Sequence, residues 1–181
     1  MRVISGKYRS RKLERVDSNK TRETKDRVKE SLFNAIHFDV VDATVLDLFA
    51  GSGALGIEAL SREAKHCDFI DQSNQAVTVI QRNIKALDIA SKCQVFQSNY
   101  EAFLKECHKR YDIILLDPPY KTYDLDQLID MIETEKRLEP YGLIVVLMHK
   151  SEVLNRHKHG IIDYKTKIKG ITKIVFLKWS D

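Results

Sequence analysis

Hydrophobic residues along the chain fall into short apolar runs and longer stretches with an apolar residue every three or four positions. Short runs are typical of buried strands, and the longer spacing is typical of helices that pack on a sheet. The pattern predicts strands at 44–49, 66–71, 93–97, 111–117, 142–148, 161–168 and 171–178. It predicts helices at 24–38, 54–62, 74–87, 100–109 and 125–135, and a short basic hairpin at 2–13.

The order of these elements predicts the fold class. Strands that alternate with helices form parallel sheets with helices on both faces. The last two strands have no helix between them, and a short connection of this kind requires an antiparallel pair. We therefore expect an α/β fold with a mixed sheet, in which one strand near the C-terminal end is reversed.

The composition fits one domain, or one domain with a small appendage, because the chain has 181 residues, 43% of them hydrophobic and 31% charged. Its three cysteines are odd in number and widely spaced, which favours neither a disulfide framework nor a zinc site. No run of eighteen apolar residues and no secretory h-region occurs. We expect a cytoplasmic protein with no membrane anchor and no metal.

The positive charge of the chain is concentrated at its start. Residues 1–30 contain 11 Lys and Arg against 5 acidic residues, whereas the whole chain has a net charge of only +4. The remaining residues therefore carry a small negative net charge. A basic segment on a near-neutral body is typical of proteins that bind a polyanion, although charge alone leaves a merely solvated arm open.

A glycine-rich turn follows the first strand, where residues 47–56 read DLFAGSGALG. A GxGxxG turn between a strand and a helix lets a ligand approach the backbone and the helix N-terminus. Asp71 follows at the end of the next strand, where a carboxylate can accept hydrogen bonds from both hydroxyls of a ribose. A nicotinamide dinucleotide would use the same features. Asp47, however, would repel a pyrophosphate, and it favours a cofactor with a cationic portion.

The sequence Asp117-Pro118-Pro119-Tyr120 ends the fourth strand, at the edge of the sheet where α/β proteins bind ligands. Ionised Asp117 is an acceptor, and the Pro118 carbonyl is a second acceptor on a rigid backbone. Two rigid acceptors suit an exocyclic NH₂ group and favour its attack on an electrophile. The Tyr120 ring offers a surface on which a planar base can stack. These residues indicate alkylation of an amino group on a flat heterocycle.

These two motifs resemble those of class I S-adenosylmethionine-dependent methyltransferases that act on amino groups. The resemblance implies a Rossmann-like, seven-stranded mixed sheet with a reversed seventh strand. It implies catalytic roles for Asp117, Pro118, Pro119 and Tyr120. It also implies an adenine-contacting turn at Ser98-Asn99, and cofactor contacts for Asp47, Phe49, Ala50, Gly51, Ser52, Gly53, Asp71, Gln72, Asn99 and Tyr100.

A narrower resemblance covers nearly the whole chain. Residues 1–6 (MRVISG), 22–34 (RETKDRVKESLFN) and 47–62 (DLFAGSGALGIEALSR) are similar to the RsmD family. Membership implies methyl transfer from S-adenosylmethionine to N2 of one guanine of 16S rRNA, of the guanine-966 type. The substrate would be rRNA in the small ribosomal subunit or in its assembly intermediate, and the enzyme would act as a monomer.

The same resemblance implies two regions: a basic RNA-binding extension at 1–40 packed on the core, and a methyltransferase domain at 41–181. The RNA-binding residues would be Arg2, Lys7, Arg9, Arg11, Lys12, Arg22, Lys25 and Arg27. The chain departs from the family pattern at Glu23, at Leu147-Met148 and at Lys169.

Three other functions remain open from the residues alone. A DNA amino-methyltransferase acting on adenine N6 or cytosine N4 would use the same tetrapeptide, although the chain is short for an additional sequence-reading domain. A binding factor for ribosome assembly could keep the fold without turnover. A nicotinamide-dependent reductase is a more distant alternative.

Overall fold

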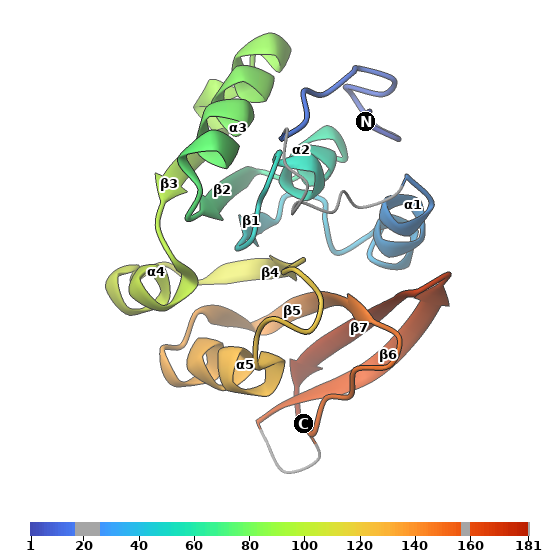
Figure 1. Cartoon of the computed structure of the whole chain (residues 1–181), viewed down its shortest axis with the longest axis vertical. Coiled ribbons are helices and arrows are strands. Elements are labelled where there is room, and N and C mark those ends of the chain that lie inside the picture. Colours follow the sequence, from blue (N-terminus) through green and yellow to red (C-terminus); the bar gives the residue numbers. More distant parts are fainter. Residues whose placement is uncertain (17–25, 157–159, 181) are drawn as a thin grey trace.

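A seven-stranded mixed sheet forms the centre of the molecule in the computed structural model, which describes residues 1–16, 26–156 and 160–180 (Figure 1). The strand order is β3-β2-β1-β4-β5-β7-β6. The strands are β1 (Thr44–Asp47), β2 (His66–Asp71), β3 (Cys93–Gln97), β4 (Tyr111–Leu116), β5 (Leu138–His149), β6 (Ile161–Lys169) and β7 (Thr172–Trp179). The helices are α1 (Asp26–Ala35), α2 (Ala54–Ser61), α3 (Asn74–Leu87), α4 (Tyr100–Glu106) and α5 (Leu125–Thr134), with a 3₁₀ turn at Ala90–Lys92.

The topology confirms the predicted fold class. Strand β1 pairs in parallel with both β2 and β4, so the chain reverses its direction of travel across the sheet between these strands. Strand β7 is antiparallel to both of its neighbours, β5 and β6. Ligands of open α/β sheets bind where the order reverses, at the carboxyl ends of the strands. The structure therefore brings the end of β1 beside the end of β4.

Two apolar layers cover the sheet. Helices α1, α2 and α3 pack on one face, where the core includes Phe33, Ile57 and Ile80. Helices α4 and α5 pack on the other face, where the core includes Leu104 and Ile129. No helix in the described parts of the chain is long and apolar enough to cross a membrane.

Most predicted boundaries agree with the structure to within three residues. The largest difference is in β5, which begins at Leu138 rather than at Gly142. Leu138 pairs with Tyr111, and the register shifts before the regular pairing resumes at Leu143. Pro140 lies in this irregular part, and proline in a strand is normally confined to such places. The apolar pattern missed this part because residues 139–142 alternate poorly.

Helix α1 ends at Ala35, three residues before the predicted end. The Ile36 carbonyl accepts hydrogen bonds from the Asp39 and Val40 amides, and Ile36 and Val40 are both buried. These contacts close a turn where apolar spacing alone predicted another helical turn. The predicted N-cap, Thr24, lies outside the described residues.

The predicted N-terminal hairpin is present, but its two arms form an isolated β-bridge rather than a ladder. Its only bridge within residues 1–16 joins Arg2 and Lys12, supported by backbone hydrogen bonds on both sides. Val3 and Leu13 are buried in the same core as α1 and α2. The hairpin and α1 therefore share the apolar core of the sheet rather than forming a core of their own.

The carboxylate of Glu58, on α2, attaches this hairpin to the sheet. Glu58 is fully buried and accepts hydrogen bonds from the backbone amides of Ile4 and Ser5 at 2.8 and 3.0 Å. Arg62 donates to the same carboxylate at 2.9 Å. Gly6 passes so close to α2 that a Cβ would lie 1.8 Å from the Ser61 carbonyl oxygen. The hairpin is thus held by specific polar contacts with α2.

Replacing Glu58 with alanine should release the hairpin, because two amides and a buried guanidinium would lose their acceptor. We expect Glu58→Ala to lower the free energy of unfolding by about 3–5 kcal/mol. Hydrogen exchange should increase at the amides of Ile4 and Ser5 more than in β4. Glu106→Ala, which removes an exposed carboxylate of α4, is the matched control and should stay near wild type. Unchanged protection of the two amides would contradict this role for Glu58.

Candidate active site

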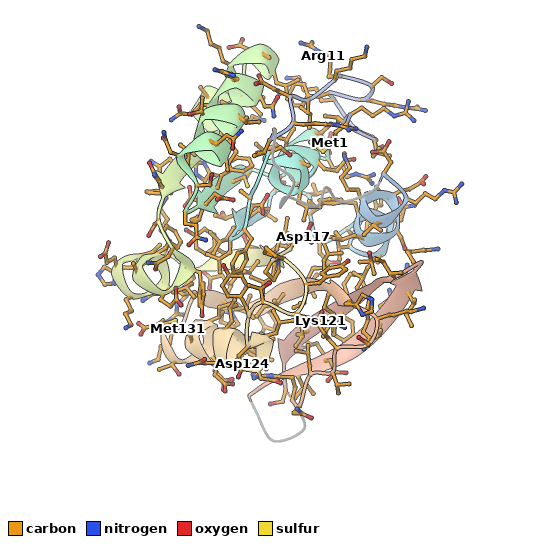
Figure 2. All side chains as sticks on the ribbon, viewed as in Figure 1. Met1, Arg11, Asp117, Lys121, Asp124 and Met131 are labelled. Atoms are coloured by element: carbon orange, nitrogen blue, oxygen red, sulfur yellow. The ribbon has the colours of Figure 1, made fainter. Side chains whose placement is uncertain are left out.

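A cavity of about 900 Å³ opens at the carboxyl ends of β1, β2, β3 and β4. Its wall contains residues from the four loops that follow these strands, together with Met1, Val28 and Thr172. In Figure 2, Asp117 lies near the middle of the molecule, at the start of the loop that follows β4. The glycine-rich turn and the Asp-Pro-Pro-Tyr sequence, which are more than sixty residues apart, therefore line one cavity.

The glycines of the glycine-rich turn have different structural roles. Gly51 lines the cavity, and its amide donates to the Asp71 carboxylate at 2.8 Å. Gly53 caps α2 in the left-handed region, with φ of 80°, and is not among the lining residues. At Gly56 a Cβ would lie 2.3 Å from the Phe69 ring, so glycine allows α2 to pack closely on β2. Gly53 was predicted to contact a cofactor, and this contact stays a prediction.

The Asp47 carboxylate is buried at the end of β1, with 1% of the residue exposed. One oxygen accepts the Gly56 amide at 2.9 Å, and the other has no hydrogen-bond partner among the described residues. Burial, together with repulsion from Asp117 and Asp71, raises the pKa of Asp47 to about 7, although the Gly56 hydrogen bond opposes the shift. An unsatisfied buried oxygen of this kind is suited to a cationic or hydrogen-bond-donating ligand.

The charged side chains of the cavity wall have one sign. Asp47, Asp71, Glu101 and Asp117 line it, and the described residues of the wall include no lysine, arginine or histidine. A pyrophosphate would meet repulsion from these carboxylates without a basic side chain to compensate, whereas a positively charged ligand would be attracted. The wall therefore disfavours a nicotinamide dinucleotide, as Asp47 alone already suggested.

Asp71 and Asn99 are positioned by hydrogen bonds to the backbone. The Asp71 carboxylate accepts the amides of Gly51 and Ser73 at 2.8 and 2.9 Å, which fixes both oxygens at the end of β2. Asn99 caps α4 by accepting the Ala102 amide at 2.8 Å. This amide oxygen was predicted to accept from an adenine amino group. A carbonyl oxygen has two lone pairs, so the cap leaves one of them for such a ligand.

Three aromatic rings gather beside the glycine-rich turn. The centroid of Phe49 lies 5.7 Å from that of Tyr100 and 5.1 Å from that of Tyr123, and the two tyrosine rings are 5.7 Å apart. All three residues line the cavity. Tyr123 was not predicted, although its place three residues after Tyr120 in the same loop was a usable signal. The rings form an apolar part of an otherwise acidic wall.

Asp117, Pro118, Pro119 and Tyr120 all line the cavity, as predicted. The Tyr120 hydroxyl donates to Thr172 Oγ1 at 2.7 Å, and its ring meets the edge of His149 at 5.8 Å between centroids. These contacts fix the ring at the cavity wall. Thr172 follows Tyr120 by fifty-two residues, and no local pattern could have identified this contact.

The described residues that were predicted to bind RNA are not among the residues that line this cavity. All six that the structure describes are exposed, namely Arg2, Lys7, Arg9, Arg11, Lys12 and Arg27. Three of them also contact the protein: Arg2 pairs with Asp26, Arg11 donates to the Ala86 carbonyl, and the Lys7 ammonium lies over the Tyr8 ring. The predicted residues Arg22 and Lys25 lie outside the described residues. Within the described ranges, no group of three His, Cys, Asp or Glu side chains is placed to hold a metal ion.

Comparison with known proteins identifies the family. The family model described as Conserved hypothetical protein 95 matches residues 1–178. The chain belongs to this family, the RsmD family that the motifs indicated. Ribosomal RNA small subunit methyltransferase D of Escherichia coli K12 is 39% identical to it, over 86% of this chain and 76% of the relative.

Solved structures place the family in a fold class. The structure of yhhF from Escherichia coli superimposes with a TM-score of 0.89 at 32% identity, covering 99% of this chain and 97% of the other. The Thermus thermophilus 16S rRNA N2 G1207 methyltransferase RsmC, in complex with AdoMet and guanosine, gives 0.69 at 24% identity over 88% of this chain and 45% of that chain. The fold is that of the class I methyltransferases, as predicted.

The raised pKa of Asp47 predicts how the stability of this protein depends on pH. Between pH 4 and 7 the folded state holds a proton on Asp47 that the unfolded state releases, so stability falls as the pH rises. Asp47→Asn removes this penalty while its amide oxygen can still accept the Gly56 amide. We expect its gain in unfolding free energy over wild type to grow by about 3 kcal/mol from pH 5 to 8.

Urea unfolding at each pH measures this difference. Asp88→Asn, an exposed carboxylate at the end of α3, is the control and should follow the wild-type profile. Parallel pH profiles of wild type and Asp47→Asn would show that Asp47 is ionised normally in the folded protein.

Proposed function

We propose that this chain is an S-adenosylmethionine-dependent methyltransferase of small-subunit rRNA, and that its target is N2 of one guanine, of the guanine-966 type. The observation that carries the proposal is the cavity itself. It joins an acidic wall, which has no basic side chain among its described residues, to an Asp-Pro-Pro-Tyr turn. Membership of the RsmD family supports rRNA as the substrate class.

The residues of the cavity fit this cofactor. Asp71 presents a carboxylate, oriented by two amides, that can accept from the ribose hydroxyls. Asp47, which lines the cavity with one carboxylate oxygen unpaired among the described residues, lies close enough to Asp117 and Asp71 to be affected by their charge, and this group of carboxylates suits the cationic portion of the cofactor. The rings of Phe49, Tyr100 and Tyr123 provide a surface for the adenine, and the spare lone pair of Asn99 can accept from its amino group. When bound, S-adenosylmethionine supplies an electrophilic methyl group.

The turn after β4 can hold and activate the guanine amino group. The Asp117 carboxylate and the Pro118 carbonyl accept its two hydrogens, which opposes delocalisation of the nitrogen lone pair into the base. The Tyr120 ring stacks on the base, and its hydroxyl is fixed by Thr172. The target nucleotide must leave its stack to reach this turn, at a cost of a few kcal/mol. Positioning of this kind can supply several kcal/mol of a methyl-transfer barrier.

The alternatives are less well supported. A DNA amino-methyltransferase would use the same tetrapeptide, but relatives that are 33% and 39% identical over most of this chain are named for rRNA. A nicotinamide-dependent reductase conflicts with the acidic wall of the cavity. A binding factor without turnover would have no need of the intact Asp117 to Tyr120 turn.

Replacing Asp117 with alanine tests the catalytic part of the proposal. The variant would lose one of the two acceptors that hold the amino group, so methyl transfer to small ribosomal subunits should fall by about 10²–10³-fold or more. Binding of S-adenosylmethionine, measured by calorimetry, should remain within a few-fold of wild type.

Asp39→Ala, which removes an exposed carboxylate after α1, should behave as wild type in both assays. Near-normal transfer by Asp117→Ala would exclude Asp117 from the reaction. Loss of both transfer and cofactor binding would indicate a role in building the cavity instead.

The exposed cations of the hairpin test the RNA-binding part. Neutralising Arg9, Arg11 and Lys12 together should weaken rRNA binding and flatten its dependence on salt, because fewer counterions are released. The slope of log K against log salt should fall by about 0.7 for each phosphate contact that is lost. A slope equal to that of wild type would remove the hairpin from the interface.

A further inference from the structure

A second cavity, of about 800 Å³, lies between α1 and the turn that joins β6 to β7. Figure 1 shows α1 beside this end of the β6–β7 hairpin. The wall from α1 includes Arg27, Glu30 and Asn34, and the wall from the hairpin includes Lys167 and Lys169. We call this cavity the basic groove, because three cations face one carboxylate among its described residues.

The lysines of the basic groove form a row along an edge strand. Lys167 and Lys169 are two residues apart on β6, so they point to the same side of the sheet, about 7 Å from each other along the strand. Lys165 precedes them on this side, with its ammonium group over the Phe176 ring. Such a row offers a polyanionic backbone more than one positive charge along its length.

The basic groove is continuous with the candidate active site. Val28 and Thr172 line both cavities. The Thr172 hydroxyl accepts a hydrogen bond from Tyr120. The groove therefore includes a residue in direct contact with the ring proposed to stack on the target base. At Gly170, in the turn of the hairpin, an added Cβ would meet nothing within 4 Å. The groove thus lies open beside the acidic cavity.

We propose that the basic groove binds the sugar-phosphate backbone of the rRNA strand next to the target nucleotide. The inference rests on the proposed function and extends it to residues of β6. A base that enters the acidic cavity stays attached to its own backbone, and that polyanion is repelled by the wall containing Asp47 and Asp117. Across the wall shared by Val28 and Thr172, the same strand meets Arg27, Lys167 and Lys169, which neutralise its phosphates.

The double variant Lys167→Ala with Lys169→Ala tests this assignment. Binding to small ribosomal subunits that lack the modification should weaken, and the slope of log K against log salt should fall by about 1.4 for two lost phosphate contacts. In methylation assays KM for the subunit should rise while kcat stays close to wild type. Binding of S-adenosylmethionine should not change.

A second double variant, Lys105→Ala with Arg110→Ala, is the matched control. It removes two exposed cations, Lys105 on α4 and Arg110 in the connection between α4 and β4, neither of which lines the basic groove, and it should keep the wild-type slope. Equal slopes for wild type and the Lys167 and Lys169 variant would overturn the inference. An equal loss in both double variants would also overturn it, because the effect would then reflect net charge alone.

Photocrosslinking identifies what the groove contacts. A photoreactive amino acid in place of Lys169 should crosslink to rRNA near the modified nucleotide, whereas one in place of Lys105 should not. Crosslinks from position 169 to ribosomal protein alone would overturn RNA as the occupant. The two proposals can fail separately. If the wild-type protein methylates rRNA and the groove has no role in binding, the proposed function stands and the groove proposal is overturned. If the wild-type protein neither binds nor methylates rRNA, both proposals are overturned.

Discussion

The hydrogen bond between the Gly56 amide and the buried Asp47 carboxylate is the contact on which the rest of the site depends. It joins the end of β1 to the first turns of α2 across the glycine-rich turn. The lack of a side chain at Gly56 lets α2 approach Phe69 on β2 closely enough for this arrangement. The bond also satisfies only one carboxylate oxygen, so the other oxygen of this cavity-lining residue has no hydrogen-bond partner among the described residues.

The distribution of charge divides the molecule into two environments. The cavity at the strand ends is acidic among its described residues, whereas the hairpin and the basic groove present cations at the surface. A cationic cofactor and a polyanionic substrate need surroundings of opposite charge. Here each would be attracted to a different region of the molecule. Glu58 keeps the hairpin attached to α2, beside the entrance where Met1 lines the cavity.

Much of the fold and of the cavity could be predicted, because both depend on local patterns. Apolar periodicity placed the strands and most helices, and the rule for ligands at strand ends brought Asp47 and Asp117 to one site. What was missed depends on contacts between distant residues. Thr172 meets Tyr120 only after β7 has paired with β5, and the early start of β5 is set by the pairing of Leu138 with Tyr111.

The separate roles of the three glycines could also not be predicted from the GxGxxG motif. The GxGxxG pattern treats its glycines as equivalent, yet Gly51 lines the cavity, Gly53 supplies a left-handed cap and Gly56 permits helix packing. Similarly, Asn99 could be placed at the correct turn from sequence, but its use as the cap of α4 required the helix that it begins.

The most direct test of this account is the identity of the methylated nucleoside. Small ribosomal subunits that lack the modification would be incubated with the wild-type protein and labelled S-adenosylmethionine, then digested and analysed by mass spectrometry, with duplex DNA treated in parallel. The account predicts N2-methylguanosine from one site in the small-subunit rRNA and no product from DNA. A methylated adenine or cytosine, or the absence of any product from rRNA, would contradict it.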